Sequence, residues 1–300
     1  MLSALLKKVY QKTFSIWQAM GFHITPNHYY LPIPDTRTLP ESLWTRRSPL
    51  VGIDLRIPQM LDLLSSFAGQ YKAEYAAFPL EKTSSPMEYF VRNRMFESVD
   101  GEILYCMIRR FKPARMVEIG SGFSTLIAAA AIRRNRQEDP KYDCTLVCIE
   151  PYPGEALQAG VPEVTNLIRL PVQEVDRKEF DALGPNDILF IDSSHVVRIG
   201  GDVTMEYLEI VPSLKPGVLV HSHDIFFPGE YPRQLVFKDR LFFSEQYLLQ
   251  AFLSLNDRFE VTWGSSCLHL GHPDRLASAF PSYDPKGDWW PRSFWYRRVR

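Results

Sequence analysis

The sequence has little excess charge of either sign, which argues against a nucleic-acid-binding protein. Its 34 Lys and Arg side chains are nearly balanced by 35 Asp and Glu, and the formal net charge is −1. Nucleic-acid-binding domains normally carry a basic patch or stripe. The only local basic run lies at residues 297–300, so we expect no nucleic-acid partner.

Cysteine is scarce, and its spacing argues against a disulfide framework or a zinc site. None of the four cysteines forms a Cys-x-x-Cys pair. Two of them flank a strand-like run, as small side chains in a reduced interior would. We therefore expect buried thiols and a cytoplasmic protein. The four are Cys106, Cys144, Cys148 and Cys267.

The first 24 residues contain no long uninterrupted hydrophobic run. Lys7, Lys8 and Lys12 interrupt the apolar pattern, and no small-residue cleavage site follows it. This excludes a signal peptide and a membrane span and predicts an amphipathic helix. Such a helix packs on its own domain or on a partner, with peripheral contact to a membrane surface as the alternative.

Hydrophobic and aromatic residues are abundant enough for a large core. The chain of 300 residues is 45% hydrophobic and contains 19 Phe, 14 Tyr and 6 Trp. This composition is typical of one large α/β domain with additions or of two small domains.

The first 95 residues are predicted to be a mostly helical N-terminal extension. Frequent prolines mark irregular chain between residues 26 and 58. Helical spacing then predicts helices over 59–75, from about 87 to 96 and over 100–111, with Asp100 as the N-cap of the last.

The pattern changes at residue 113 to short apolar runs that alternate with helical stretches. Near-continuous apolar runs are typical of parallel strands covered on both faces, and this alternation predicts an α/β domain with a doubly wound parallel sheet over residues 96–270. A helix is expected at 244–253, late strands at 259–270 and an aromatic tail over the surface at 271–300. The expected parallel strands are 116–119, 145–150, 167–172, 187–192 and 217–224.

Polar residues follow three of these strands, where ligands of such sheets bind. The turn Glu118-Ile-Gly120-Ser121-Gly122-Phe-Ser124 allows a ligand close to the backbone, or is a structural turn alone. Glu150 can accept hydrogen bonds from both ribose hydroxyls, or can face solvent. Val172 and Gln173 could border an adenine, or could be ordinary loop residues.

Four motifs in this order, EIGSGFST, IEPYP, LFIDSSH and KPGVLVHSHDIFFPGEYP, resemble those of class I S-adenosylmethionine-dependent methyltransferases. The chain is most similar to the macrocin-type branch, which methylates hydroxyls of small molecules and sugars, over about residues 87–270. The resemblance implies a seven-stranded-type, mostly parallel sheet and S-adenosylmethionine as cofactor. It implies that Glu118, Gly120 and Gly122 line the methionine portion, that Glu150 holds the ribose, and that Val172 and Gln173 border the adenine. Ser124 replaces the third glycine of the family pattern.

Acidic and histidine residues at the ends of the fourth and fifth strands suggest a metal site. Asp192, His223 and Asp224 could converge on one divalent ion. Macrocin-type relatives use magnesium, but His223 stands in place of the first residue of an Asp-Asp pair, which favours softer ions and leaves Mg, Mn or Fe open. His195 and His221 are candidate bases, and without a metal His223 could be the base. Each histidine could also be structural.

The predicted function is metal-assisted methyl transfer from S-adenosylmethionine to a hydroxyl of a small molecule or saccharide. One alternative is an iron-dependent oxygenase with a two-histidine-one-carboxylate site on the same fold. Another is a non-catalytic binding protein. A nicotinamide dehydrogenase is disfavoured because the turn lacks G-x-G-x-x-G spacing. The aromatic tail could stack on a sugar, anchor the chain end or join a homodimer.

Overall fold

The computed structural model describes residues 4–300, and side chains from residue 8 onward, as two compact units. One unit comprises the described part of Met1–Arg46 and Pro232–Phe242. The other, which we call the sheet unit, comprises Arg47–Tyr231 and Phe243–Arg300. The first unit holds the α-helix α1 (Ala4–Ala19), the 3₁₀ helices η1 (Thr36–Thr38) and η2 (Glu41–Trp44), and the π-helix η5 (Leu235–Asp239). The predicted boundaries at residues 95 and 270 stay predictions.

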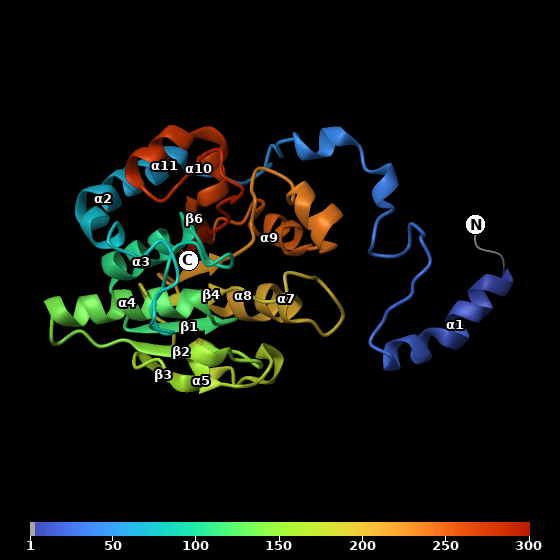
Figure 1. The fold of residues 1–300 in the computed structure, drawn as a ribbon, viewed down its shortest axis with the longest axis horizontal. Helices are drawn as coiled ribbons and strands as arrows, with labels where there is room; N and C mark the ends of the chain where they lie inside the picture. The colour runs from blue at the N-terminus through green and yellow to red at the C-terminus, as the bar shows by residue number, and fades with distance from the viewer. Residues whose placement is uncertain (1–3) are drawn as a thin grey trace. The chain divides into compact units, whose positions relative to one another are not determined.

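A seven-stranded sheet forms the centre of the sheet unit (Figure 1). Its order is β3-β2-β1-β4-β5-β7-β6, and every pairing from β3 to β5 is parallel. Only β7 runs against its neighbours. The α/β prediction with a mostly parallel sheet is confirmed. The strands are β1 (Arg115–Ile119), β2 (Thr145–Ile149), β3 (Val164–Ile168), β4 (Ile188–Ile191), β5 (Leu219–Ser222), β6 (Phe259–Gly264) and β7 (Phe294–Arg298).

The strand order reverses between β1 and β4. The chain runs from β1 outward to β3 and then returns to place β4 on the other side of β1. Beyond the last β1 residue, Asp192 N donates a hydrogen bond of 2.8 Å to Ile119 O, and Gly120 N donates one of 3.0 Å to Ile149 O. In open α/β sheets, such a reversal is where ligands bind.

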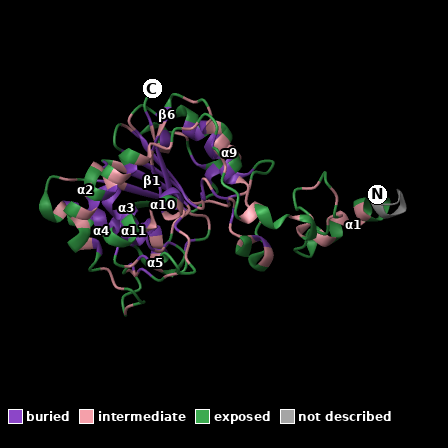
Figure 2. Ribbon diagram, turned by 90° about the horizontal axis from the view of Figure 1, so that it is seen from above, coloured by how far each residue is buried: buried purple, intermediate pink, exposed green. Residues whose placement is uncertain are grey.

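Helices cover both faces of this sheet. Figure 2 shows α2, α3 and α4 on one side of β1 and α9 on the other. The predicted helices at 59–75, 100–111 and 244–253 are confirmed as α2, α3 and α9. The helices of the sheet unit are α2 (Ile57–Tyr75), α3 (Asp100–Phe111), α4 (Phe123–Glu138), α5 (Glu155–Ala159), the 3₁₀ helix η3 (Val172–Glu174), α6 (Lys178–Asp181), α7 (Asp202–Met205), the π-helix η4 (Glu206–Ile210), α8 (Val211–Ser213), α9 (Glu245–Leu253), α10 (Ser265–Gly271) and α11 (Pro273–Ala279).

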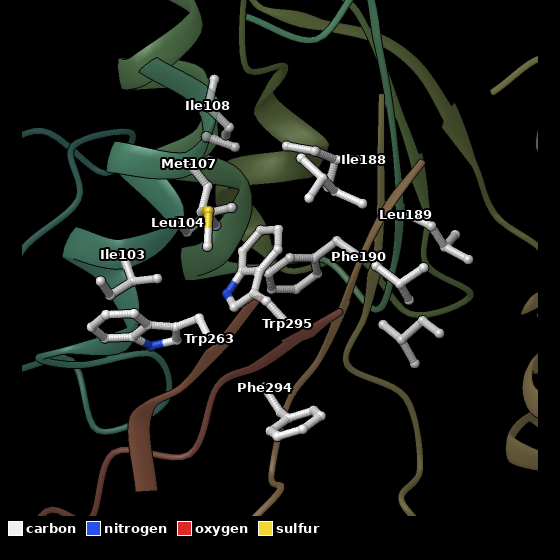
Figure 3. Close-up of a cluster of buried hydrophobic side chains, with 14 of the residues drawn as sticks. Ile103, Leu104, Met107, Ile108, Ile188, Leu189, Phe190, Trp263, Phe294 and Trp295 are labelled. Atoms are coloured by element: carbon white, nitrogen blue, oxygen red, sulfur yellow. The ribbon is translucent and has the colours of Figure 1, made fainter. Parts of the chain in front are cut away.

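The core between the sheet and α3 is rich in large aromatic side chains. Trp295 of β7 lies beside Met107 of α3 and next to Phe190 of β4, and Trp263 of β6 lies beside Ile103 of α3 (Figure 3). All five are fully buried. Burial on this scale fixes the sheet against the helix layer.

The helix predicted from about residue 87 to 96 is wrong. This segment has no regular structure, because the Asn93 side chain takes the place of helical hydrogen bonds. Its amide donates to Phe90 O and Phe96 O, and its carbonyl accepts from Met95 N and Phe96 N. Asn commonly competes with helices in this way. Asp100 is likewise not a cap, since its carboxylate accepts from the backbone N of Arg292 and of Ser293.

The predicted surface tail is also wrong, because residues 294–298 form β7 inside the sheet. Val220 of β5 and Val261 of β6 both pair with Tyr296, which is fully buried. The late-strand prediction holds for 259–264 only, since residues 265–271 form α10. The third strand lies at 164–168 rather than 167–172, because an edge strand is half exposed and does not read as a buried apolar run.

The four cysteines are free and buried, as predicted. Among the described residues, no helix combines the length and apolarity needed to cross a membrane.

Candidate active site

The turn after β1 is shaped by its neighbouring strand. Gly120 has φ +77°, and a Cβ on it would lie 1.8 Å from the carbonyl oxygen of Asp192. Only glycine fits this backbone and this approach. At Gly122, by contrast, a Cβ would meet no heavy atom within 4 Å. The backbone at the end of β4 is therefore what excludes a side chain at Gly120, whereas the space beside Gly122 is open.

Glu118 is a buried carboxylate with one free oxygen. Its Oε2 accepts hydrogen bonds from Thr125 Oγ1 (2.6 Å) and Cys148 Sγ (3.4 Å), whereas its Oε1 has no partner. Burial raises the pKa of Glu118 to about 7, although the hydroxyls of Thr125 and Ser124 oppose this. The buried hydroxyl of Ser121 is also without a partner. Two unmet polar atoms in one turn indicate a place for a polar ligand.

Glu150 lies beside this turn, at the end of β2. Its Oε2 accepts from Ser121 N at 3.2 Å, and its Oε1 accepts from Tyr152 N at 2.7 Å. These backbone donors fix the carboxylate, and each oxygen keeps a second lone pair for a ligand hydroxyl.

The predicted adenine residues lie on η3. Val172 is buried, whereas Gln173 is exposed and its Nε2 donates to Gly200 O at 3.0 Å. The side-chain oxygen of Gln173 is the part left for an adenine edge.

His195 lies among three carboxylates on the other side of Asp192. Its Nε2 is 3.3 Å from Asp192 Oδ1 and 3.3 Å from Asp224 Oδ2, and its Nδ1 is 2.7 Å from Glu245 Oε2. Burial alone would lower the pKa of His195, but the three carboxylates together raise it well above its usual value. The ring thus contacts all three acids, Asp192 and Asp224 through Nε2 and Glu245 through Nδ1.

Asp224 also pairs with Arg292. The Asp224 Oδ1 and Arg292 Nε atoms are 3.1 Å apart, and the guanidinium lies 3.9 Å from the ring centroid of Trp289. Burial would raise the pKa of Asp224, but Arg292 and then His195 hold it below its usual value. Asp224 thus lies between Arg292 and His195.

His221 and His223 face the aromatic core rather than this cluster. His221 Nε2 lies 2.8 Å from Ser293 Oγ, and its ring stacks on Phe190 at 4.0 Å. Burial, followed by the influence of His223, lowers the pKa of His221 well below its usual value. His223 is buried next to Phe96, and neither of its ring nitrogens has a hydrogen-bond partner.

The predicted metal ligands do not come together as a set. Asp192 and Asp224 both meet His195 Nε2, whereas His223 faces Phe96. Within residues 4–300, no three His, Cys, Asp or Glu side chains are arranged to hold an ion. The described residues therefore do not fit the expected divalent metal.

Comparison with known proteins places the chain in a family. Residues 117–225 match the profile of a family described as a methyltransferase domain. An uncharacterized protein of Archaeoglobus fulgidus is 32% identical over 184 residues, which are 58% of this chain and 80% of that protein. The chain belongs to the same family as this archaeal protein. The matched methyltransferase domain contains every site residue predicted from the sequence.

Two solved methyltransferases are more distantly similar. The O-methyltransferase from Bacillus cereus, in complex with S-adenosylhomocysteine (SAH), is 14% identical with a TM-score of 0.39, over 97% of this chain and 100% of that chain. The plantazolicin methyltransferase BamL, in complex with a triazolic desmethylPZN analog and SAH, is 11% identical with a TM-score of 0.40, over 81% of this chain and 96% of that chain.

Four residues around His195 and Asp224 were not predicted from the sequence: Glu206, Tyr207, Glu245 and Arg292. Glu245 and Arg292 lie beyond the matched methyltransferase domain, in segments without a recognisable motif. Glu206 and Tyr207 lie within it, on the π-helix η4, where the wider turn is invisible to a search for 3.6-residue periodicity. Glu206 Oε2 accepts from Ser193 Oγ at 3.0 Å. The signal that could have found Glu206 and Glu245 is an acidic residue that begins a mostly apolar helical segment.

Proposed function

We propose that this chain is an S-adenosylmethionine-dependent methyltransferase that methylates a hydroxyl of a small molecule or saccharide. The methyltransferase-domain match over residues 117–225 supports the reaction class. The observation that carries the proposal is the buried, unpartnered Glu118 Oε1 beside the open space over Gly122, next to the His195 cluster. Membership of the macrocin-type branch is part of the proposal.

The residues at the ends of β1 and β2 suit this cofactor. Glu118 Oε1 and Ser121 Oγ would bind polar groups of the methionine portion, and Glu150 would accept hydrogen bonds from the ribose hydroxyls. Carboxylates on both sides of the turn suit a positively charged ligand. When bound, S-adenosylmethionine supplies an electrophilic methyl group on a cationic sulfur.

The His195 cluster can orient a hydroxyl and take its proton. Asp192, with 27% of its side chain exposed, can accept a hydrogen bond from the hydroxyl. The hydroxyl must lose its proton as the new C–O bond forms and the bond between the methyl carbon and sulfur breaks, and His195 Nε2, 3.3 Å from Asp192 Oδ1, is the nitrogen that would accept this proton. The ring must first be neutral to serve as this base. Because the predicted metal ligands do not converge, the proposal assigns the proton step to side chains.

Binding of SAH, measured by calorimetry, tests the cofactor site. We expect the wild-type protein to bind SAH and the Glu150→Ala variant to bind at least about tenfold more weakly, because the ribose loses its acceptor. Glu155→Ala, a change at the first residue of α5, is the control and should bind as the wild type does. No binding by the wild type at any pH would overturn the proposal.

The oxygenase alternative makes a different prediction for turnover. It requires oxygen consumption that depends on added iron and continues without S-adenosylmethionine. That result would contradict methyl transfer. His221, one of the histidines that such an iron site could use, is instead stacked on Phe190 in the core.

A further inference from the structure

We infer that Glu245 is a positioning residue that fixes the ring of His195, so that Nε2 faces Asp192 and Asp224. The inference rests on the proposed function, in which His195 Nε2 accepts the proton of the methyl acceptor. Glu245 Oε2 lies 2.7 Å from His195 Nδ1, on the opposite side of the ring from that step. A carboxylate at Nδ1 keeps the proton there when the ring is neutral, and leaves Nε2 free to accept one.

Glu245 is itself held in one position. Its Oε1 accepts a hydrogen bond of 2.5 Å from Tyr207 OH, and the same hydroxyl lies 2.6 Å from Ser222 Oγ on β5. Each carboxylate oxygen of Glu245 therefore has a protein partner. Because Glu245 has no exposed surface, water does not compete for these oxygens. The side chain therefore has a single hydrogen-bonded orientation, and that orientation determines the orientation of the imidazole.

The backbone of α9 also fixes the backbone of His195. Ser244 N and Glu245 N both donate to His195 O, at 2.9 and 3.1 Å, and Ser244 Oγ accepts from Val197 N at 2.8 Å. His195 has φ +60°, a left-handed conformation that side-chain-bearing residues adopt only where their surroundings enforce it. The first turn of α9 provides these surroundings, so ring and backbone are set by the same two residues.

The location of Glu245 is costly for stability alone. A carboxylate without exposed surface loses its hydration, and an apolar side chain would pack beside Tyr207 without that cost. Its position in the first turn of α9 offsets part of this cost through the helix dipole. Of the two side chains that contact the carboxylate, Tyr207 and His195, only His195 has a role in the proposed reaction.

The first test reads the His195 ring directly and needs no activity. The ring nitrogens are observed by ¹⁵N NMR in protein labelled at histidine, with His195→Gln to assign the signals. At a pH high enough for the ring to be neutral, we expect one form in the wild type, with its proton fixed at Nδ1, and the same form in Glu245→Gln, whose amide oxygen can still accept from Nδ1–H. In Glu245→Ala we expect the protons to be distributed over both nitrogens. An unchanged His195 spectrum in Glu245→Ala would overturn the inference.

The second test separates positioning from structure by kinetics. We expect Glu245→Ala to lose about tenfold or more of kcat, within the roughly 10²–10⁴-fold that a general base contributes, with SAH affinity and the KM for the methyl donor unchanged. Glu245→Gln should recover most of kcat. Wild-type kcat in Glu245→Ala, or an equal loss in both variants, would contradict positioning by hydrogen bonding.

A matched control distinguishes the two partners of the carboxylate. Tyr207→Phe removes the hydroxyl that contacts Glu245 Oε1 and Ser222 Oγ but leaves the contact between Glu245 Oε2 and His195 Nδ1, so it should keep the His195 proton at Nδ1 while lowering thermal stability. If Glu245→Ala does not fold, the NMR test is made on Glu245→Gln and Tyr207→Phe. If the His195 protons are distributed over both ring nitrogens in Tyr207→Phe but not in Glu245→Gln, Tyr207 and not Glu245 is the positioning residue. If the wild type does not bind SAH, the proposed function fails, while the NMR result still decides whether Glu245 fixes the ring.

Discussion

Two glycines, two residues apart in the same turn, have different physical roles. At Gly120 a Cβ would collide with the Asp192 carbonyl, and the backbone is left-handed. At Gly122 the same atom would enter open space. The sequence presents both as members of one cofactor motif, and only the structure separates the glycine that joins two strands from the one that leaves room for a ligand.

This difference predicts that alanine substitutions at the two glycines affect different properties, stability at Gly120 and ligand binding at Gly122. Gly120→Ala should lower the free energy of unfolding by about 1–3 kcal/mol or more, because strain and the clash add. Gly122→Ala should leave stability within about 0.5 kcal/mol and weaken SAH binding. Urea denaturation and calorimetry on both variants provide the measurement. Equal losses of stability would show that the second position is also closed.

Glu118 predicts a dependence of stability on pH. Its pKa is about 7 in the folded chain and 4.5 in the reference state, so the folded protein binds the proton more tightly. Because the pKa is raised in the folded protein, the contribution of Glu118 to stability is largest below pH 4.5 and is lost as pH rises from 4.5 to about 7. The difference corresponds to roughly 3 kcal/mol. Glu118→Gln should remove this part of the pH dependence, as measured by denaturation at pH 5 and pH 8; an unchanged difference between the two pH values would contradict the assignment.

Among single residues, those that follow a buried strand could be predicted and those that approach from elsewhere could not. Glu150, Asp192 and Asp224 were proposed because each follows an apolar run, and Glu118 because it lies in such a run directly before the glycine turn. Glu245 lies 50 residues from His195, and nothing local marks their contact. His221 was expected at the site because it shares a strand face with His223, but that face is the one packed on the aromatic core.

At the level of elements, prediction succeeded where a segment is buried on both faces. Strands β1, β2, β4 and β5 were located to within two residues at each end, because such strands read as continuous apolar runs. The edge strand β3 was misplaced, and the segment around Asn93 was taken for a helix because its side-chain hydrogen bonds are not visible as periodicity. The strand β7 was missed because its sequence, FWYRR, shows neither alternation nor an aliphatic run.

The position of β7 predicts a large loss from a substitution near the end of the described chain. Trp295 is fully buried between β5 and β6, so Trp295→Ala should lower the free energy of unfolding by about 3–5 kcal/mol. Val299 lies just beyond the strand and is 38% exposed, and Val299→Ala is the control, with an expected loss of less than about 1 kcal/mol. Chemical denaturation of both variants gives the comparison. If Trp295→Ala and Val299→Ala lowered the free energy of unfolding by similar small amounts, residues 294–298 would not be part of the buried sheet.

At the scale of the whole molecule, the near-neutral composition conceals a strongly acidic site. The net charge is −1, yet four acidic side chains, Glu118, Asp192, Asp224 and Glu245, lie at or beside the carboxyl edge of the sheet. They come from β1, from the ends of β4 and β5, and from α9, and all belong to the sheet unit. Chain-wide charge argues against a nucleic-acid partner, but it could not reveal this acidic cluster. That feature appears only when the strand order brings the four segments together.

The strand order also has a consequence for biosynthesis. The edge strand β6 is joined to the sheet through β7 alone, although β6 precedes β7 by some thirty residues of chain. As a nascent chain emerges, β1 to β5 can assemble in the order in which they are translated, but β6 must wait for a strand made after it. Until then β5 has an open edge, with unpaired backbone groups that can recruit strands of other chains. Ribosome stalling between residues 265 and 293 would therefore leave a nascent chain whose site-bearing strands are formed but whose sheet is exposed to aggregation, and to the chaperones that recognise such edges.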